Sequence, residues 1–265
     1  MSKLNDLFTK ELHVVNLGIE SFAEDLASQG KKIVHVSWKP VAGGDKVAAG
    51  NLRKLQTPAM QEKIKAANAE ALRRILDAQP VLVGMGIARD VIPGMTEDTI
   101  LHAGPPVTWE RMCGPQRGAV MGGLIYEGRA KKLEEAEKLA ASGKIRFAPC
   151  HMHSAVGPMA GVVTPSMPVW IIENKAFGNR AYCTMNEGLG KVLRFGACDQ
   201  EVFDRLHWMS AHLYPILKAA LEQKGEIDLR LLVAQCLQMG DEAHNRNKAA
   251  TSLLIRELVG PIMGL

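Results

Sequence analysis

The first hundred residues alternate short apolar runs with segments of helical spacing, and this alternation constrains the fold more than any other feature. The apolar runs occupy residues 14–19, 32–38 and 80–86. Between them, residues 21–26 and residues 60–76 place apolar side chains at helical intervals, the second set as one buried stripe behind a Thr57-Pro58 helix start. The order strand–helix–strand–helix–strand predicts a small parallel sheet with right-handed crossovers. We therefore expect an α/β fold whose first part, residues 1–95, is a Rossmann-like domain.

The middle of the chain, residues 96–198, is rich in glycine and proline and holds most of the clustered polar residues. The pattern predicts a helix over residues 127–142, and strands at residues 145–149, 169–173 and 181–185. Loops of this composition commonly carry functional sites. We expect a loop-rich α+β segment that carries the polar motifs.

The last segment, residues 199–265, has helical spacing throughout. Asp199 is a predicted cap for its first helix, and Asp228 begins a second helix that ends at Met239. A third helix is expected over residues 241–259, where Gly260-Pro261 stops it. The chain ends soon afterwards on an apolar tail, so we expect a helical C-terminal part that is truncated.

Charge and cysteine content argue against several kinds of partner and environment. The 265 residues include 32 Lys+Arg and 28 Asp+Glu, and the formal charge of +4 requires neither a nucleic acid nor an acidic membrane. An apolar content of 47% is too high for a disordered chain, and no run of 18 apolar residues occurs. The five cysteines form no CxxC pair, which suits reduced thiols. We expect a cytoplasmic globular protein with no nucleic-acid or membrane partner.

Nucleotide motifs are absent from the sequence. Gly84, Gly86 and Gly94 follow the third apolar run, but their spacing is not GxGxxG, and a turn at the sheet edge explains them better. No GxxxxGK[ST] motif for a nucleotide phosphate occurs. The sequence therefore predicts no cofactor.

A glycine-rich loop at residues 111–118 contains Arg111, Gln116 and Arg117. Two guanidinium groups flanked by glycines can present paired donors to a phosphate or a carboxylate. If a helix starts in the segment that follows, its free N–H groups would add to an anion site. A solvated connecting loop is the alternative.

His151 and His153 lie at the end of a predicted strand. Residues two apart on a strand face the same side, so both imidazoles could share one metal ion or one substrate. The pattern resembles the metal-binding strand of amidohydrolase-type enzymes, but the later histidines 207, 212 and 244 fall in helical sequence. We favour hydrogen bonds to substrate or backbone oxygens over a metal site.

Amide and charged side chains decorate the next pair of strands: Asn174, Arg180, Asn186 and Glu187. Such side chains at strand ends suit the recognition of a planar carbamoyl or carboxylate group. For the asparagines, turn chemistry explains the pattern equally well. His244 and Asn245 begin the last expected helix, where either a surface helix start or a ligand-directed one would account for them.

Several long motifs resemble a bacterial family of unknown-function proteins encoded beside FdrA, a protein similar to acyl-CoA synthetases. The motifs are Trp38-Lys39-Pro40 with Gly43-Gly44-Asp45, and the stretches 110–118, 150–161, 173–190 and 239–247. The family looks like a subunit of oxamate carbamoyltransferase in purine (allantoin) nitrogen catabolism. The resemblance implies that oxalurate and phosphate give oxamate and carbamoyl phosphate in a multi-subunit enzyme with an FdrA-like partner. Members of the family run well beyond the end of this chain.

Residue types suggest roles for such a reaction. Arg111 and Arg117 would bind phosphate, Arg180 the carboxylate, and His151 or His153 would polarise the carbamoyl oxygen or supply a proton. Asn174, Asn186 and Asn245 would recognise the amide groups, with Gln116, Glu187 and His244 also at the substrate. Two alternatives stay open: a non-catalytic partner of the FdrA-like protein, and a metal-dependent amidase or hydrolase that uses the two histidines.

Overall fold

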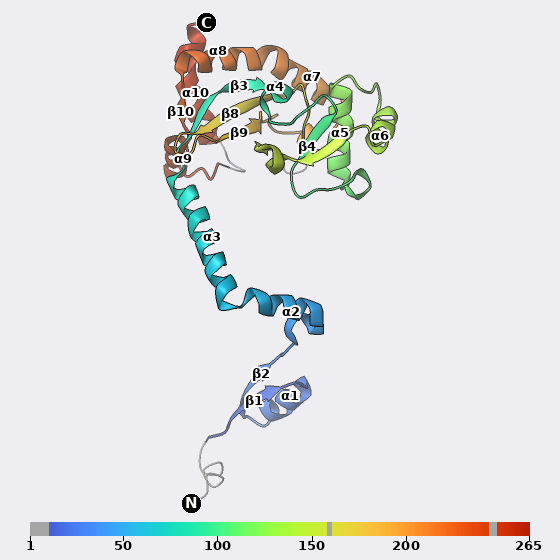
Figure 1. Ribbon diagram of the computed structural model, residues 1–265, viewed down its shortest axis with the longest axis vertical. Helices are drawn as coiled ribbons and strands as arrows, with labels where there is room; N and C mark the ends of the chain where they lie inside the picture. Colours follow the sequence, from blue (N-terminus) through green and yellow to red (C-terminus); the bar gives the residue numbers. More distant parts are fainter. Residues whose placement is uncertain (1–10, 158–160, 244–247) are drawn as a thin grey trace, which may run out of the picture. The chain divides into compact units, whose positions relative to one another are not determined.

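The structure is a computed structural model, which describes residues 11–157, 161–243 and 248–265. The chain divides into two compact units, residues 1–75 and residues 76–265 (Figure 1). Among the described residues, no helix is both long and apolar enough to cross a membrane.

The first unit contains a two-stranded parallel sheet. β1 (His13–Leu17) and β2 (Lys32–Val36) pair from His13 opposite Lys32 to Leu17 opposite Val36, and α1 (Glu20–Ser28) connects them. This arrangement confirms the small parallel sheet expected at the N-terminus. Two further helices follow, α2 (Lys46–Leu55) and α3 (Pro58–Asp77).

The predicted start of α3 is confirmed, but its predicted burial is wrong. The Asp45 carboxylate caps α2 by accepting from the N–H groups of Val47 and Ala48. Pro58 opens α3, where its missing N–H costs no hydrogen bond. The apolar stripe of α3 is largely exposed, with Ile75 at 72%. Helical periodicity marks a face that is able to pack, but it does not supply the surface against which to pack.

The second unit contains a five-stranded sheet in the order β10–β3–β8–β9–β6. β3 (Pro80–Ile87) pairs antiparallel with β8 (Pro168–Asn174) and with β10 (Ile227–Asp228). β8 forms a hairpin with β9 (Arg180–Thr184), and β6 (Ala155–Val156) pairs parallel to β9. The expectation that β3 is the third strand of the N-terminal parallel sheet is therefore wrong. An apolar run identifies a buried strand without specifying its partner.

A second sheet of this unit has the order β5–β4–β7. β4 (Thr99–His102) and β5 (Arg146–Pro149) are parallel, and β7 (Val162–Val163) is antiparallel to β4. The crossover between β4 and β5 holds α5 (Gly114–Tyr126) and α6 (Leu133–Ala141). A helix over 127–142 was expected, but α6 begins only at Leu133, because the left-handed Gly128 ends the preceding helix. A short helix, α4 (Ala88–Val91), links the two sheets along the chain.

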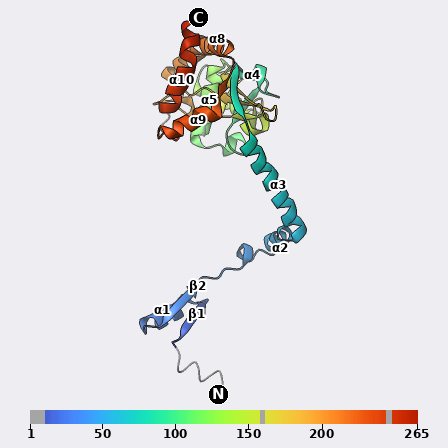
Figure 2. The same ribbon diagram turned by 90° about the vertical axis from the view of Figure 1, so that its left-hand side faces the viewer.

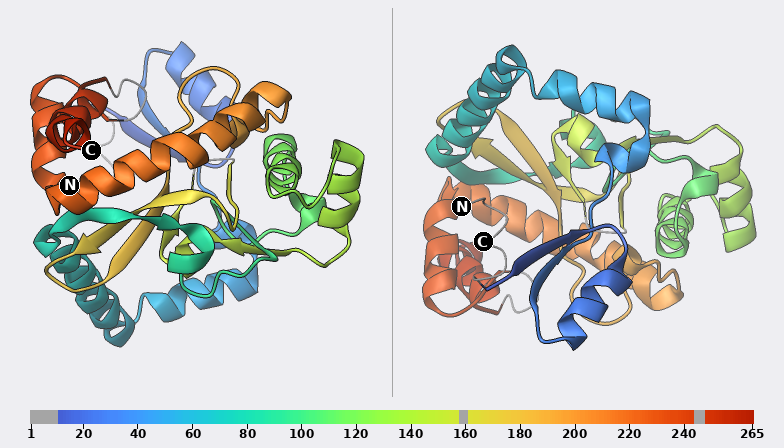
Figure 3. Two further views of the ribbon diagram at one scale, coloured as in Figure 1. Left: turned by 90° about the horizontal axis from the view of Figure 1, so that it is seen from above. Right: turned by 90° about the horizontal axis from the view of Figure 1, so that it is seen from below.

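The C-terminal part is helical, as expected. Asp199 caps α7 (Gln200–Trp208), and one π-helical turn leads into α8 (Tyr214–Lys224), which packs on β3 and on α10 (Lys248–Met263) (Figures 2 and 3). Asp228 caps α9 (Leu229–Gln238).

The predicted bounds of the last helix are wrong at both ends. α10 (Lys248–Met263) begins later than residue 241 and runs through Gly260-Pro261. The buried carboxylate of Asp241 accepts from the N–H groups of Ala249 and Ala250, so that it serves the first turn of α10 as a cap.

The core of the second unit consists of three clusters. One surrounds α5, where Val120 and Leu124 pack on Ile100 of β4. A second lies between the two sheets around Leu101 and Val169, and a third lies under α8 and α10 around Leu221 and Leu258. Together these clusters fix the ends of β8, β9 and α5, where the candidate site is found.

Candidate functional site

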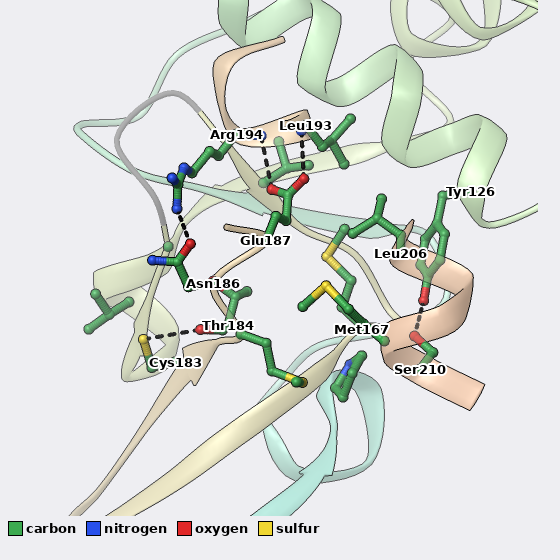
Figure 4. A pocket seen from close by; sticks show the side chains of 16 residues that line it. Tyr126, Met167, Cys183, Thr184, Asn186, Glu187, Leu193, Arg194, Leu206 and Ser210 are labelled. Atoms are coloured by element: carbon green, nitrogen blue, oxygen red, sulfur yellow. Dashed lines mark hydrogen bonds between the residues drawn. The ribbon is translucent and has the colours of Figure 1, made fainter. Parts of the chain in front are cut away.

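A cavity of about 290 Å³ lies where β8 begins, β9 ends and α5 ends. Thr184 of β9 pairs with Val169 of β8, so the residues around this pair lie at one end of the hairpin. The cavity is lined by Tyr126, Val156, Gly157, Val162, Met167, Pro168, Cys183, Thr184, Met185, Asn186, Glu187, Leu193, Arg194, Leu206, Met209 and Ser210 (Figure 4). Its size is near the lower limit of small-molecule sites, about 300 Å³.

One wall is a polar loop, residues 186–194, whose conformation is fixed by hydrogen bonds within the loop. The Glu187 carboxylate accepts from the backbone N–H of Leu193 at 2.6 Å and from that of Arg194 at 3.2 Å. The Arg194 guanidinium donates through one Nη to Asn186 Oδ1 and through the other to the Gly188 carbonyl at 2.9 Å. The loop therefore positions a cation and an amide beside each other in the wall (Figure 4).

This wall keeps free donors. Arg194 Nε is buried and has no hydrogen-bond partner among the described residues, and each Nη of Arg194 keeps a second hydrogen beside the bond that it makes. Asn186 uses its oxygen for Arg194 and for the Gly188 N–H, which leaves its amide nitrogen as a donor. A guanidinium and an amide N–H side by side suit a carboxylate with a neighbouring carbonyl oxygen.

The opposite side of the cavity carries a hydroxyl pair. The Tyr126 hydroxyl lies 2.6 Å from Ser210 Oγ, and the Tyr126 ring stacks on His207 with centroids 5.2 Å apart (Figure 4). Burial raises the pKa of Tyr126 above its ordinary value, so this phenol stays protonated at neutral pH.

The carboxylate of Glu127, next to Tyr126, holds the turn that precedes β8. Its Oε1 accepts from the Ser166 N–H at 2.9 Å, the Ser166 hydroxyl at 2.8 Å and the Thr164 hydroxyl. Three donors on one carboxylate oxygen fix the turn that leads into Met167. These hydrogen bonds therefore fix the backbone position from which the Met167 side chain enters the cavity.

Between the polar wall and the hydroxyl pair the lining is apolar. Met167, Leu206 and Met209 are each less than 9% exposed, and half-buried Met185 lies beside them in the lining. Thioether side chains are polarisable and adapt to irregular apolar groups.

Two of the sequence-predicted site residues, Asn186 and Glu187, lie in this cavity, whereas Asn174 and Arg180 do not. Asn174 ends β8 and Arg180 begins β9, at the other end of the hairpin, about 20 Å from Pro168 by strand geometry. Asn174 Oδ1 accepts from the N–H groups of Gln79 and Ala176, which is turn chemistry. Arg180 pairs with Glu173 at 2.8 Å.

Gln116 and Arg117 lie near the start of α5, and Arg111 ends the 3-10 helix Trp109–Arg111 that precedes it; all three lie outside the cavity. Cys113 precedes this helix and makes no side-chain cap, so the N–H groups of the first turn keep their partial positive charge. Arg117 donates to the Glu110 carbonyl at 2.7 Å and stacks over Trp109. Arg111 is exposed.

The expectation that His151 and His153 extend from one side of a strand is wrong. Residues Cys150–His153 form a 3-10 helix, in which side chains two apart point in different directions. His151 is exposed, whereas His153 is buried with its Nδ1 2.6 Å from the Pro93 carbonyl. Within the described part of the chain, no three His, Cys, Asp or Glu residues are placed to hold a metal ion. The predicted His244 and Asn245 lie outside the described residues.

Sequence reasoning missed Arg194, Tyr126 and Ser210. No motif marks them, because each is an isolated polar residue in an otherwise apolar or charged segment. Tyr126 and Ser210 are 84 positions apart in the chain and meet only in the folded protein.

Two thiols lie at or near the cavity. Burial raises the pKa of Cys150 to about 11, and it also raises the pKa of Cys183, which lines the cavity. Both thiols are therefore protonated at neutral pH and suit packing better than nucleophilic attack.

Residues 145–265 match the family model described as oxamate carbamoyltransferase subunit AllG. The chain is 51% identical over 257 residues to the uncharacterized protein YahG of Escherichia coli (strain K12), which covers 97% of this chain and 54% of that protein. It is 43% identical over 208 residues to oxamate carbamoyltransferase subunit AllG of the same organism. This match covers 78% of this chain and 50% of that protein.

A solved structure is also similar, the crystal structure of a conserved protein of unknown function from Enterococcus faecalis V583. Its TM-score is 0.75 at 53% sequence identity, over 78% of this chain and 50% of that one. The chain spans about half the length of the curated relatives that it matches.

Proposed function

Residues 145–265 match the AllG family model, and from this premise we propose that the chain is a subunit of an oxamate carbamoyltransferase-like enzyme. The reaction is the phosphorolysis of oxalurate to oxamate and carbamoyl phosphate, in purine (allantoin) nitrogen catabolism. One observation carries the proposal: every residue that lines the cavity, except Tyr126, lies within the matched segment. The segment that resembles AllG therefore carries nearly all of the cavity lining.

The polar wall fits the substrate of this reaction. Arg194 binds the carboxylate of oxalurate, and the amide nitrogen of Asn186 donates to a carbonyl oxygen beside it. Attack on the carbamoyl carbon, at the other end of oxalurate, creates a tetrahedral oxyanion, and the protonated phenol of Tyr126 suits it as a donor. Glu187 is a positioning residue, because its hydrogen bonds to the backbone of Leu193 and Arg194 hold the loop.

Hydrogen phosphate itself supplies the proton that the leaving oxamate nitrogen needs, so the reaction balances without a further proton donor. Hydrogen phosphate attacks the carbamoyl carbon through one oxygen, the bond from that carbon to the oxamate nitrogen breaks, and the proton of hydrogen phosphate goes to this nitrogen. The products are carbamoyl phosphate and oxamate.

In this proposal phosphate first binds at the start of α5, outside the cavity, and then enters the cavity, where the attack takes place. The uncapped N–H groups of its first turn favour an anion, and Arg111 and Arg117 add positive charge. Arg111 is exposed and therefore free to meet a ligand that a second subunit presents. An FdrA-like protein is the proposed partner, in an oligomeric assembly in the cytoplasm.

A non-catalytic role as a partner of the FdrA-like protein is the second candidate. It is favoured by exposed apolar side chains on α9 and α10, including Leu237 at 60% and Ile255 at 56%. Such side chains are typical of an interface between subunits.

The first experiment measures carbamoyl phosphate formed from oxalurate and phosphate, with the protein alone and then mixed with its FdrA-like partner. We expect turnover in the mixture. Arg111→Ala should abolish turnover and leave assembly intact, while the exposed Arg146→Ala serves as a control with both unchanged. Loss of assembly in Arg111→Ala would favour the non-catalytic role, and an assembled mixture without turnover would reject the reaction.

A further inference from the structure

The apolar middle of the cavity has no use in binding oxalurate. Oxalurate contains no C–H bond, so it offers nothing to Met167, Leu206 and Met209, which are each buried in the lining. Where a purely polar ligand lies against an apolar surface, its polar groups lose water without gaining hydrogen-bond partners, so this contact contributes little to binding. A ligand with a hydrocarbon body would use this surface.

The two polar groups of the cavity lie on opposite sides of the apolar lining. Arg194 and Asn186 form one wall, Tyr126 and Ser210 lie across from them, and Met167 lies between (Figure 4). The protonated Tyr126 phenol can donate to a carbonyl oxygen. A ligand that uses every group therefore carries an anion at one end, a carbonyl or amide at the other, and an aliphatic part between them.

We propose that this cavity selects a carboxylate with an aliphatic body and an amide head, of the class of N-carbamoyl derivatives of branched aliphatic amino acids. The inference rests on the proposed function, because it takes the same cavity as the substrate site. Arg194 binds the carboxylate, the Tyr126–Ser210 pair binds the carbamoyl oxygen, and Met167, Met185 and Met209 select the side chain.

The test is isothermal titration calorimetry of the full chain with three probes: N-carbamoyl-leucine, N-carbamoylglycine and oxalurate. Burial of one methylene is worth about fourfold in affinity. We expect the leucine derivative to bind at least about 20-fold more tightly than the glycine derivative, and more tightly than oxalurate.

Variants assign the selectivity to the lining. Met185 is half-buried, so Met185→Gln should keep the fold, as checked by circular dichroism. It should lower the affinity for the leucine derivative at least about fivefold and leave the glycine derivative unchanged. Met152→Gln is the matched control, because Met152 is 62% exposed and does not line the cavity.

The outcomes separate the two proposals. This inference would be overturned by any of three results: oxalurate binds most tightly, the leucine and glycine derivatives bind equally, or no probe binds. Tightest binding of oxalurate would leave the proposed function intact. Tight binding of the leucine derivative, together with no oxalurate phosphorolysis by the assembled mixture, would support the inference and reject oxalurate as the substrate. Equal loss of affinity in Met185→Gln and Met152→Gln would also overturn it.

Discussion

In the proposed site, ligand recognition should depend most on Arg194. Its guanidinium is held by hydrogen bonds from its two Nη atoms to Asn186 and Gly188. Each Nη carries a second hydrogen, which is available to a ligand oxygen. A guanidinium that is already held in one orientation loses little side-chain freedom when it binds an anion.

We expect Arg194→Ala to weaken binding of oxamate to the full chain by about 10-fold to 100-fold, because a hydrogen bond to a charged group is worth about 1.5–3 kcal/mol. Arg194→Lys should recover only part of the loss, since an ammonium cannot form the paired bonds of a guanidinium. Calorimetric titration measures both. Arg146→Ala, on the exposed part of β5, should bind like the wild type, and unchanged binding by Arg194→Ala would contradict the assignment.

Part of the site could be predicted at the residue scale. Asn186 and Glu187 stand next to Gly188 and Gly190 in the sequence, and this composition is typical of loops that carry functional sites. Asn174 and Arg180 show the same composition, yet the structure uses them for a turn and for an ion pair with Glu173. Composition identifies loops that are able to bind, whereas the hairpin decides which end of the strands each loop occupies.

At the scale of elements, the cavity depends on how closely α5 approaches the loop that carries Arg194. Gly118 of α5 lies against Gly196, and a Cβ at Gly118 would be 2.5 Å from the Gly196 carbonyl oxygen. Gly196 has φ of +85° and in turn lies against Pro115. Backbone therefore meets backbone at this contact, and neither side is able to yield by a rotamer change.

We expect Gly118→Ala to lower the free energy of unfolding by about 1–3 kcal/mol, because the added methyl forces the helix and the loop apart. It should also reduce oxamate binding, since the loop carries Arg194. Chemical denaturation and titration measure the two effects.

The comparison variant is Gly84→Ala in β3, where a Cβ would meet nothing within 4 Å. Its stability should change by less than about 1 kcal/mol. Equal stability of Gly118→Ala and Gly84→Ala would contradict the close contact between α5 and the loop that carries Arg194.

At the scale of the whole molecule, the two units differ in the size of their hydrophobic cores. All the buried apolar side chains of the described chain lie in residues 76–265, except Ala23. The first unit leaves Val15, Leu17 and Val34 of its sheet more than 60% exposed. A two-stranded sheet with an open face is marginal by itself, whereas the second unit has three clusters of its own.

We expect the fragment 76–265 to fold and to keep the cavity, because the clusters and the lining residues all come from this part of the chain. A cooperative thermal transition and oxamate affinity within about threefold of the full chain are the expected results. A fragment without a cooperative transition, or with lost affinity beside a folded full chain, would contradict this independence.

The sequence by itself determined the local elements. The N-terminal parallel pair, the strands of residues 145–185 and the starts of α3, α7 and α9 follow from apolar periodicity and from Asp and Pro at helix starts. Its long motifs also pointed to the family whose model, oxamate carbamoyltransferase subunit AllG, matches residues 145–265. These signals are local, so one stretch of chain is enough to carry them.

Only the tertiary structure decided which elements meet. It paired β3 antiparallel with β8, carried α10 through Gly260-Pro261, and turned His151 and His153 in different directions. It also brought Tyr126, Arg194 and Ser210 to one cavity from three separate segments. Strand partners and cavity walls are set by packing between distant segments, which depends on the burial available in the whole fold and leaves no periodic trace in the sequence.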